Sequence, residues 1–421
     1  MADAYIIDAV RTPRGIGKVG KGKLAHMHPQ HLAATVLKAL KDRNHIKTDE
    51  VDDIIWSTST QKGTQGQDLG RMAALDAGYD VKASGVTLDR FCGGGITSVN
   101  FAAAQIMSGM EECVIAGGTE MMSLTSTMAQ AEAAAGWAPI GVAGSSGNAR
   151  LQALHPQSNQ GVCGDAIASM EGISREQLDR AGFISQQRAA KAIEEGRFDK
   201  SIVPVLDDDG EVILAKDEYP RPGTTLEGLA ALKPAFEGVA DVAIDESGQT
   251  FRQAINAKYP DVEIKAVHHA GNSSGVVDGA AALLLASKDY AEKMGWKPRA
   301  RIVAMANVGD DPTLMLNAPV PAAKKALEKA GLSKDDIDLW EINEAFAVVS
   351  EKFIRDLELD RDKVNVNGGS IALGHPIGAT GSILIGTLMD ELERTGKKRG
   401  LATMCAAGGM APAIIIERIE S

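Results

Sequence analysis

Two cysteines and one histidine stand in glycine-rich stretches that lie far apart in the chain. Cys92 opens the run Cys-Gly-Gly-Gly, His375 lies within Gly-His-Pro-Ile-Gly, and Cys405 precedes Ala-Ala-Gly-Gly. The thiolate is the nucleophilic form of cysteine, and a neutral imidazole is the usual base that activates it. Glycines let a ligand approach the backbone and leave N–H groups free to bind developing negative charge. These residue types indicate nucleophilic catalysis by a thiol.

Each of these residues also has an ordinary structural interpretation. Free cysteines are commonly packing residues, so Cys92 is equally explained as a packed side chain beside a tight turn. A histidine at a turn, such as His375, is common in proteins of every kind. Asn343 follows the strand-like residues 339–342 at the start of an expected helix, where an asparagine either caps the helix or orients a water. The residue patterns alone leave these alternatives open.

The first third of the chain predicts alternating short strands and helices. We expect strands at residues 5–8, 53–57, 86–88 and 113–118, and helices at 30–41, 69–77 and 96–108. This alternation is typical of an α/β fold. It places Cys92 at a strand-to-helix turn, where the helix dipole favours the thiolate and lowers the pKa of the thiol from about 8.5.

The pattern changes in the middle of the chain and then returns. Residues 122–276 contain glycine-rich and turn-rich stretches around a long predicted helix at 175–195, which indicates an insertion. Strand and helix alternation resumes at 280–287 and runs from 300 to 416. The turns at Cys92 and at His375 are each followed by a helix and an Ala-Gly-Gly triplet. This similarity suggests a duplication, although two unrelated βαβ units give the same impression.

Composition excludes several classes of protein. The 421 residues correspond to two or three domains of about 150 residues each. A net charge of −12 argues against a nucleic-acid-binding face, and 4% aromatic residues argue against a base-stacking platform. No apolar stretch approaches the roughly 18 residues of a membrane helix, and the first residues lack the basic flank of a secretory signal. We therefore expect a cytoplasmic protein without nucleic-acid or membrane partners.

The remaining cysteines and a cluster of histidines give weaker signals. The four cysteines show no C-x-x-C spacing, so we expect free thiols and no zinc site. Cys113 is expected in the core, while Cys163 fits either packing or a pocket lining. His26, His28 and His31 lie on both sides of Pro29 at a helix start and lack carboxylate support, so a metal site is not expected there.

Six motifs, in order and spread over nearly the whole chain, resemble the thiolase family. They are Arg-Thr-Pro-Arg-Gly (11–15), Cys-Gly-Gly-Gly (92–95), Ala-Gly-Asn-Ser-Ser-Gly (270–275), Asn-Glu-Ala-Phe (343–346), Gly-Gly followed by Gly-His-Pro (368–376) and Cys-Ala-Ala-Gly-Gly-Met (405–410). Thiolases make or break a carbon–carbon bond between acyl-CoA units by ping-pong chemistry. The resemblance therefore implies an acyl-CoA C-acyltransferase.

The resemblance assigns a catalytic role to each matching residue. It implies that Cys92 forms the acyl-enzyme and that His375 takes the proton of that thiol. Cys405 matches the second thiol, which exchanges a proton with the α-carbon of acetyl-CoA or with CoA. Asn343 matches the residue holding a water that, with His375, binds the thioester oxygen of the enolate. The backbone N–H groups of Cys92 and Ala407 would form the other oxyanion hole.

The resemblance also suggests how the substrate is held. Ser274 matches a position that contacts the pantetheine arm, and Phe346 of the Asn-Glu-Ala-Phe motif is expected to contact substrate. Arg221 is a candidate for the nucleotide end of CoA, with a solvated surface arginine as the alternative. CoA thioesters are substrates in this chemistry, so we expect neither a separate cofactor nor a metal.

The implied architecture is the thiolase fold. It consists of two duplicated α/β halves, each with a mixed five-stranded sheet, arranged in five αβαβα layers with an inserted loop domain. We expect the N-terminal domain at residues 1–121 plus 277–299, the insertion at 122–276 and the C-terminal domain at 300–421. Family precedent favours a homodimer or homotetramer.

Three departures from the family pattern leave the acyl-chain preference open. Ala407 replaces a glycine found in many relatives, which matters if that position needs a positive φ. Residues 161–166 stand near where biosynthetic relatives carry a His-Met pair. The segment 237–265 is longer than in short-chain relatives, so it either shapes the pocket of a bulkier acyl group or is a solvated surface excursion.

The expected function is reversible cleavage of 3-ketoacyl-CoA by CoA, or the corresponding condensation with acetyl-CoA. One alternative is a degradative thiolase for longer, branched or ring-derived chains. A second is a condensing enzyme of the ketoacyl synthase type, which normally uses two histidines and lacks a counterpart of Cys405. A third is a non-catalytic CoA-binding protein that has kept the fold.

Overall fold

One mixed sheet runs through the protein. The computed structural model describes residues 3–134, 147–245 and 247–420. Within these residues the strand order is β10-β11-β12-β9-β1-β8-β5-β3-β4, with β2 paired to β8 and a separate β6–β7 hairpin. The strands are β1 (Ala4–Arg11), β2 (Gly15–Ile16), β3 (Asp53–Ser57), β4 (Val86–Leu88), β5 (Cys113–Met121), β6 (Val205–Leu206), β7 (Val212–Leu214), β8 (Val277–Ser287), β9 (Ala300–Gly309), β10 (Leu339–Ile342), β11 (Arg399–Thr403) and β12 (Met410–Arg418).

The two halves of the sheet repeat one pairing pattern. In the first half β1 pairs antiparallel with β8, β8 antiparallel with β5, and β5, β3 and β4 run parallel. In the second half β9, β12, β11 and β10 follow the same sequence of directions. Where β4 would recur, the described residues show only a parallel bridge between Trp340 and Val364. The expected duplication is confirmed, with the fifth strand of the second half reduced to this bridge.

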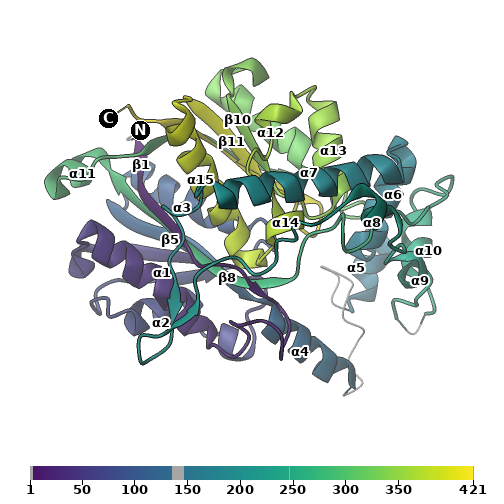
Figure 1. The fold of residues 1–421 in the computed structure, drawn as a ribbon, viewed down its shortest axis with the longest axis horizontal. Helices are drawn as coiled ribbons and strands as arrows, with labels where there is room; N and C mark the ends of the chain where they lie inside the picture. The colour runs from purple at the N-terminus through teal and green to yellow at the C-terminus, as the bar shows by residue number, and fades with distance from the viewer. Residues whose placement is uncertain (1–2, 135–146, 246, 421) are drawn as a thin grey trace.

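The helices place the sheet halves in the expected five layers (Figure 1). Helices α3 (Gly94–Ser108) and α15 (Ile377–Thr395) contact strands of both halves and form the central layer. α3 carries no charged residue, as expected for a helix that is buried over most of its length. The outer layers are α1 (Pro29–Asn44) and α2 (Leu69–Asp76) on the first half, and α12 (Pro319–Ala330) and α13 (Ala347–Asp356) on the second. The short α11 (Lys288–Met294) follows β8.

The two central helices touch backbone to backbone near their N-termini. A Cβ atom added to Gly95 would lie 2.8 Å from the backbone nitrogen of Gly381, so no larger residue fits there without a shift. The hydroxyl of Ser382 donates a hydrogen bond to the carbonyl oxygen of Gly95 at 3.1 Å. This contact brings the turn that precedes α3 close to the loop that precedes α15.

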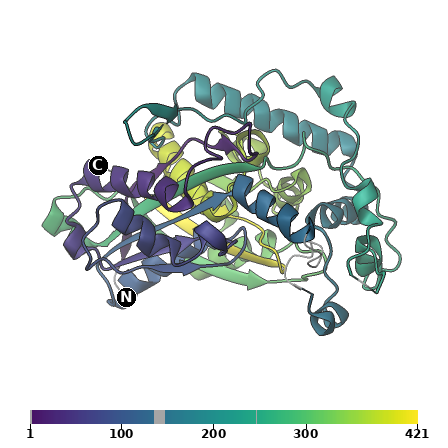
Figure 2. The same ribbon diagram turned by 90° about the horizontal axis from the view of Figure 1, so that it is seen from below.

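The stretch from 122 to 276, where we expect the insertion, supplies helices that lie mostly on the right in Figures 1 and 2, while its β6–β7 hairpin packs against the first half, with Val205 and Leu214 in the core cluster of Leu32. Its long helix α7 is capped by Ser174 through a capping box with Gln177, and it packs against α13 and the short α14 (Ser370–Leu373). The helices are α4 (Met122–Ala134), α5 (Ala149–Leu154), α6 (Gln160–Glu171), α7 (Arg175–Glu194), α8 (Leu226–Ala230), α9 (Glu237–Ala240) and α10 (Phe251–Asn256).

The segment 237–265 is a folded part of this insertion. It contains α9 and α10, and α10 buries Phe251, Ala254 and Ile255 in the same core cluster as Val162 and Ile167 of α6. The segment is therefore not merely a solvated excursion, and its influence on the acyl pocket stays a prediction. Among the helices of the described residues, none has the length and apolarity needed to span a membrane.

Candidate active site

Cys92 lies in the turn between β4 and α3, as the sequence predicts. Gly93 is the N-cap of α3, and Phe91 adopts a positive φ of 48° just before the cysteine. A left-handed conformation is unfavourable for an aromatic residue and is often kept at functional turns. Only 6% of the Cys92 surface is exposed. The turn thus holds the thiol in the protein interior, two residues before the first residue of α3.

The loop between α14 and α15 fixes the protonation pattern of His375. The hydroxyl of Thr380 donates to the carbonyl oxygen of Pro376 at 3.0 Å, so its proton is already used. The ring Nδ1 of His375 lies 2.6 Å from the same hydroxyl oxygen and must therefore donate to it. The hydrogen-bond network thus assigns the hydrogen to Nδ1 and leaves the lone pair on Nε2. His375 is held in the tautomer that a base requires.

Asn343 faces this lone pair from the end of β10. Its Nδ2 lies 3.3 Å from Nε2 of His375, and its Oδ1 accepts a hydrogen bond of 2.5 Å from the hydroxyl of Ser370. The helix that follows, α13, begins at Ala347 with Phe346 as its N-cap. The helix-capping interpretation of Asn343 is therefore wrong, because its side chain points toward His375 instead of the helix end.

Cys405 lies in the turn between β11 and β12, next to the turn of Cys92. A Cβ atom added to Gly93 would lie 3.4 Å from Cβ of Ala406, which shows how closely the two turns approach. Ala406 pairs with Met410, and the positive φ angles of this turn, 78° and 72°, belong to Gly408 and Gly409. Ala407 has no positive φ, so the alanine fits where many relatives carry a third glycine.

Burial keeps the acid–base groups of this cluster neutral. Burial, reinforced by the positive charge of Arg14, lowers the pKa of His375 to about 3. Burial, reinforced by the negative charge of Glu120, raises the pKa of Cys92 to about 12. Burial also raises the pKa of Cys405, and the nearby Cys92 adds to this effect. The expectation that the helix dipole depresses the pKa of Cys92 is wrong here, because desolvation outweighs the dipole.

Sequence reasoning missed a buried carboxylate that contacts the start of the central helix α15. Glu120, at the end of β5, accepts hydrogen bonds from Gln65 Nε2 at 2.6 Å and from the backbone N–H of Gly378 in the first turn of α15 at 2.9 Å. Desolvation raises the pKa of Glu120. The only available signal was its position directly after the Gly-Gly-Thr run of β5. Gln160, the first residue of α6, was also missed, and its side chain hydrogen-bonds to Cys92.

The three other residues expected to contact substrate lie in different settings. Ser274 is half-buried, and its backbone N–H donates to the carbonyl oxygen of Ala345 at 3.0 Å, beside the Asn343 loop. Phe346 is buried and packs edge-on against the ring of Phe236. Arg221 is exposed and lies over the ring of Tyr219 at 5.6 Å. Ser274 and Phe346 thus adjoin the Asn343 loop, while Arg221 is a surface residue, and their contacts with substrate stay predictions.

The two remaining cysteines are packing residues. The Cys163 thiol is fully buried and donates to the carbonyl oxygen of Thr313 at 3.3 Å. This contact decides the open question in favour of packing. Cys113 is fully buried in β5, as expected for a core thiol.

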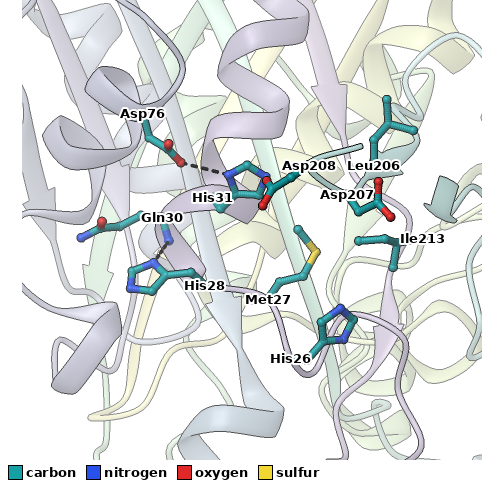
Figure 3. Close-up of a pocket in the computed structure, with 10 residues that line it drawn as sticks. All are labelled: His26, Met27, His28, Gln30, His31, Asp76, Leu206, Asp207, Asp208 and Ile213. Atoms are coloured by element: carbon teal, nitrogen blue, oxygen red, sulfur yellow. Dashed lines mark hydrogen bonds and ion pairs between the residues drawn. The ribbon is translucent and has the colours of Figure 1, made fainter. Parts of the chain in front are cut away.

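The histidine cluster lines a separate surface pocket of about 530 Å³ (Figure 3). His31 lies 3.2 Å from the carboxylate of Asp76, so carboxylate support is present, contrary to the expectation from sequence. His28 instead caps α1 by accepting a hydrogen bond from the backbone N–H of Gln30. The ring of His26 lies apart from the rings of His28 and His31 (Figure 3). In the described part of the chain, no group of three or more histidine, cysteine or acidic residues is placed to hold a metal ion.

The raised pKa of Cys92 predicts how its alkylation depends on pH. In the free protein, the rate of Cys92 alkylation by iodoacetamide should rise about tenfold for each pH unit between 7 and 9, because thiolate remains the minor form throughout. An ordinary thiol levels off near its pKa of about 8.5. Mass spectrometry of the Cys92 peptide measures the rate, and a rate that levels off near pH 8.5, as for an ordinary thiol, would contradict the burial argument.

Comparisons with known proteins agree with this geometry. Residues 4–244 match the family "Thiolase, N-terminal domain" and residues 296–418 match "Thiolase, C-terminal domain". The chain is 39% identical to a beta-ketoadipyl-CoA thiolase of Acinetobacter baylyi, covering 100% of both chains. It is also 39% identical to a steroid 3-ketoacyl-CoA thiolase of Mycobacterium tuberculosis, covering 100% of this chain and 95% of the relative.

A solved structure leads to the same conclusion. The crystal structure of the acetyl-CoA acetyltransferase of Bacillus anthracis superimposes with a TM-score of 0.82 at 34% identity, covering 100% of this chain and 99% of that one. The fold, the two matching domains and full-length relatives above 30% identity all point to one family. The chain belongs to the thiolase family.

Proposed function

We propose that this protein is an acyl-CoA C-acyltransferase that exchanges acyl groups between CoA and a 3-ketoacyl-CoA through an acyl-enzyme on Cys92. The observation that carries the proposal is that the turns of two buried thiols adjoin, while the helix that follows Cys92 touches the helix that follows His375, whose Nε2 lies beside the amide of Asn343. The names of full-length relatives, which include thiolases and an acetyl-CoA acetyltransferase, support the same chemistry.

In the cleavage direction the proposed first step breaks the bond between the α- and β-carbons of the 3-ketoacyl-CoA. The sulfur of Cys92 attacks the 3-keto carbon while His375 takes the thiol proton. The bond to the α-carbon then breaks, its electron pair forms the enolate of acetyl-CoA, and Cys405 supplies the proton that converts the enolate to acetyl-CoA. The Nδ2 of Asn343, beside Nε2 of His375, lies where it can orient a water toward the enolate oxygen.

In the second proposed step free CoA takes the acyl group. Cys405, now a thiolate, accepts the thiol proton of CoA, and the CoA sulfur attacks the thioester carbonyl of acyl-Cys92. The tetrahedral intermediate places its negative oxygen near the backbone N–H groups of Cys92 and Ala407. Collapse releases acyl-CoA, and Cys92 recovers its proton from His375. The condensation direction runs through the same steps in reverse.

Neutral resting groups fit this division of labour. With the pKa of His375 near 3 and that of Cys92 near 12, no thiolate–imidazolium pair exists in the empty site. Charge therefore forms when substrate supplies the carbonyl oxygen that accepts it, so the thiol is protected from other electrophiles. We further propose a cytoplasmic location, because all four cysteines are free thiols.

Separating the two half-reactions tests the roles of the thiols. With acetoacetyl-CoA, the wild-type protein should gain one acetyl group on Cys92, visible by mass spectrometry of the intact chain. With acetyl-CoA as the donor, Cys405→Ala should still acetylate Cys92, because CoA leaves as a stable thiolate, but it should lose, by at least about 10³-fold, the exchange of the acetyl-CoA methyl protons with deuterium from D2O. Cys163→Ala is the matched control, since that buried thiol lies in the packing core and should change neither reaction. An unmodified wild-type chain would support the non-catalytic alternative.

The acyl chain is a second point on which we make a proposal. The insertion packs the extra segment 237–265 onto α6, whose first residue Gln160 touches Cys92. Relatives named for β-ketoadipyl and steroid 3-ketoacyl substrates are 39% identical to this chain and one named acetyl-CoA acetyltransferase is 38% identical, so the names do not separate the two preferences. The packing of segment 237–265 onto α6 leads us to favour a degradative thiolase for longer or ring-derived chains over a short-chain acetyl-CoA acetyltransferase.

Steady-state kinetics decide between these two preferences. We expect kcat/KM for a long-chain 3-ketoacyl-CoA to exceed that for acetoacetyl-CoA by about tenfold or more, since each well-buried methylene adds about 0.8 kcal/mol of binding. Cleavage by CoA is followed through the loss of absorbance of the 3-ketoacyl-CoA magnesium enolate. A preference for acetoacetyl-CoA would overturn the degradative assignment.

The free edge of the sheet supports a homodimer. β4 ends the sheet and has no strand partner beyond β3 among the described residues. Next to it lies an apolar groove of about 410 Å³, lined in part by Val86, Phe101 and Met110, of which Phe101 is 43% exposed. An unpaired edge strand beside exposed apolar side chains fits a second copy related by a two-fold axis, which would pair β4 with β4.

A charge in this groove should separate the subunits. Phe101→Arg should halve the mass of the protein measured by light scattering during gel filtration, because the charge would be buried in the apolar contact. Leu226→Arg, at an equally exposed apolar residue of α8 in the insertion, is the matched control and should leave the mass unchanged. An unchanged mass for Phe101→Arg would exclude β4 as the dimer interface.

A further inference from the structure

Residues 268–275, called here the connecting segment, touch both catalytic loops. The carbonyl oxygen of Asn272 accepts the backbone N–H of Ala347, at the end of the Asn343 loop, at 2.9 Å. The carbonyl oxygen of Gly275 accepts the backbone N–H of His375 at 2.8 Å. The position of this segment therefore helps to set the positions of Asn343 and of His375.

Two buried histidine–carboxylate pairs anchor the start of the connecting segment to the insertion. The Nδ1 of His268 lies 2.8 Å from Asp165 Oδ1 of α6, and Nε2 of His269 lies 2.7 Å from Asp179 Oδ1 of α7. All four side chains are at least 95% buried. Burying such groups is costly unless they are paired, so losing either partner of a pair should disturb the contacts that the pair makes.

The second ring nitrogen of each histidine accepts a backbone N–H, but at different places. Nδ1 of His269 accepts the N–H of Gly271, within the connecting segment itself. Nε2 of His268 accepts the N–H of Val348, in the first turn of α13, at 3.4 Å. The ring of His268 also packs edge-on against Phe346, with centroids 5.5 Å apart. Only His268 of the two therefore reaches the end of the Asn343 loop.

This loop is held at both ends. At its start the backbone N–H of Asn343 donates to the carbonyl oxygen of Thr403 at 3.2 Å, which ties it to β11. At its end Phe346 and Val348 rest on His268. If the second support is lost, Asn343 can move relative to Nε2 of His375, from which its Nδ2 is 3.3 Å away.

We propose that His268 is a positioning residue that, braced by Asp165, holds the Asn343 loop in place for the step that forms or protonates the enolate. This inference rests on the proposed function, in which Asn343 serves the enolate and not the acylation of Cys92. It therefore predicts a selective defect: enolate chemistry should suffer while acyl transfer to Cys92 is largely kept.

A matched pair of substitutions isolates the contact with Val348. In His268→Asn the amide occupies the place of Cγ and Nδ1, so it keeps a donor for Asp165 and loses the acceptor for Val348. In His268→Gln the longer amide reaches the place of Nε2 and can still accept that N–H. Both variants lose the ring that packs on Phe346, and His268→Gln also lacks the donor for Asp165 at the place of Nδ1. A faster exchange in His268→Gln than in His268→Asn therefore reports the hydrogen bond to Val348.

Two rates are measured on each variant, and each rate is divided by the concentration of Cys92 that can be acylated. They are the acetylation of Cys92 by acetyl-CoA, which releases CoA and forms no enolate, and the exchange of the acetyl-CoA methyl protons in D2O. His268→Asn should slow the exchange about tenfold, which corresponds to one lost hydrogen bond, while acetylation changes by less than about threefold. His268→Gln should recover exchange to within about threefold of the wild type. Equal losses in both rates, or equal exchange in the two variants, would overturn the proposal.

His269→Asn is the control for general loosening of the insertion. This substitution breaks the buried pair of His269 with Asp179 and leaves the contact with Val348 in place. It should therefore change the acetylation rate and the exchange rate in parallel. A loss of exchange alone would contradict the role proposed for His268. If His268→Asn does not fold, Asp165→Asn tests the hydrogen bond that holds His268. We then expect exchange to slow about threefold while acetylation is retained. Parallel losses of both rates would overturn the proposal. A wild-type protein that fails to acetylate Cys92 contradicts the proposed function itself.

Discussion

The backbone contact between α3 and α15 is the constraint on which the geometry of the active site depends. Each helix begins two residues after a proposed catalytic residue, Cys92 for α3 and His375 for α15. Because Gly95 and Gly381 allow the helices to touch near their N-termini, the turns that carry Cys92 and His375 are brought to the same end of the central layer. The duplicated halves thus contribute the nucleophile from one copy and the base from the other.

This close packing also determines the electrostatics. The same helices that bring the thiols and the imidazole together exclude water from them, and desolvation is the largest effect on the pKa of Cys92, His375 and Cys405. The buried Arg14 donates to the carbonyl oxygen of Gly374 at 3.2 Å, so its charge opposes protonation of the neighbouring His375. The thiols and the imidazole therefore stay uncharged until the substrate supplies its polarisable carbonyl group. Charge separation then occurs during the reaction, and it does not destabilise the folded protein beforehand.

The sequence predicted what depends on local patterns. The turn at Cys92, the strand 86–88 and the helix that follows came from short-range periodicity, and the order of the motifs led to the family. Two features could not be predicted in this way. The pKa of Cys92 depends on burial by segments far along the chain, which a turn and a helix dipole do not reveal. The pairs His268–Asp165 and His269–Asp179 join residues 103 and 90 positions apart, so neither sequence neighbourhood contains a hint of its partner.

The attachment of the insertion explains how it can act on the site without disturbing the sheet. It leaves the sheet at the end of β5 and returns at the start of β8, and these strands pair directly, with Met121 opposite Asp278. Asp278 closes the base of the insertion by accepting the backbone N–H and the hydroxyl of Ser123. Both ends of the insertion are thus fixed where β5 ends and β8 begins, next to Glu120, which contacts α15. Changes within the insertion can therefore alter the acyl pocket or the support of the Asn343 loop, while the pairing that unites Cys92, His375 and Cys405 is left intact.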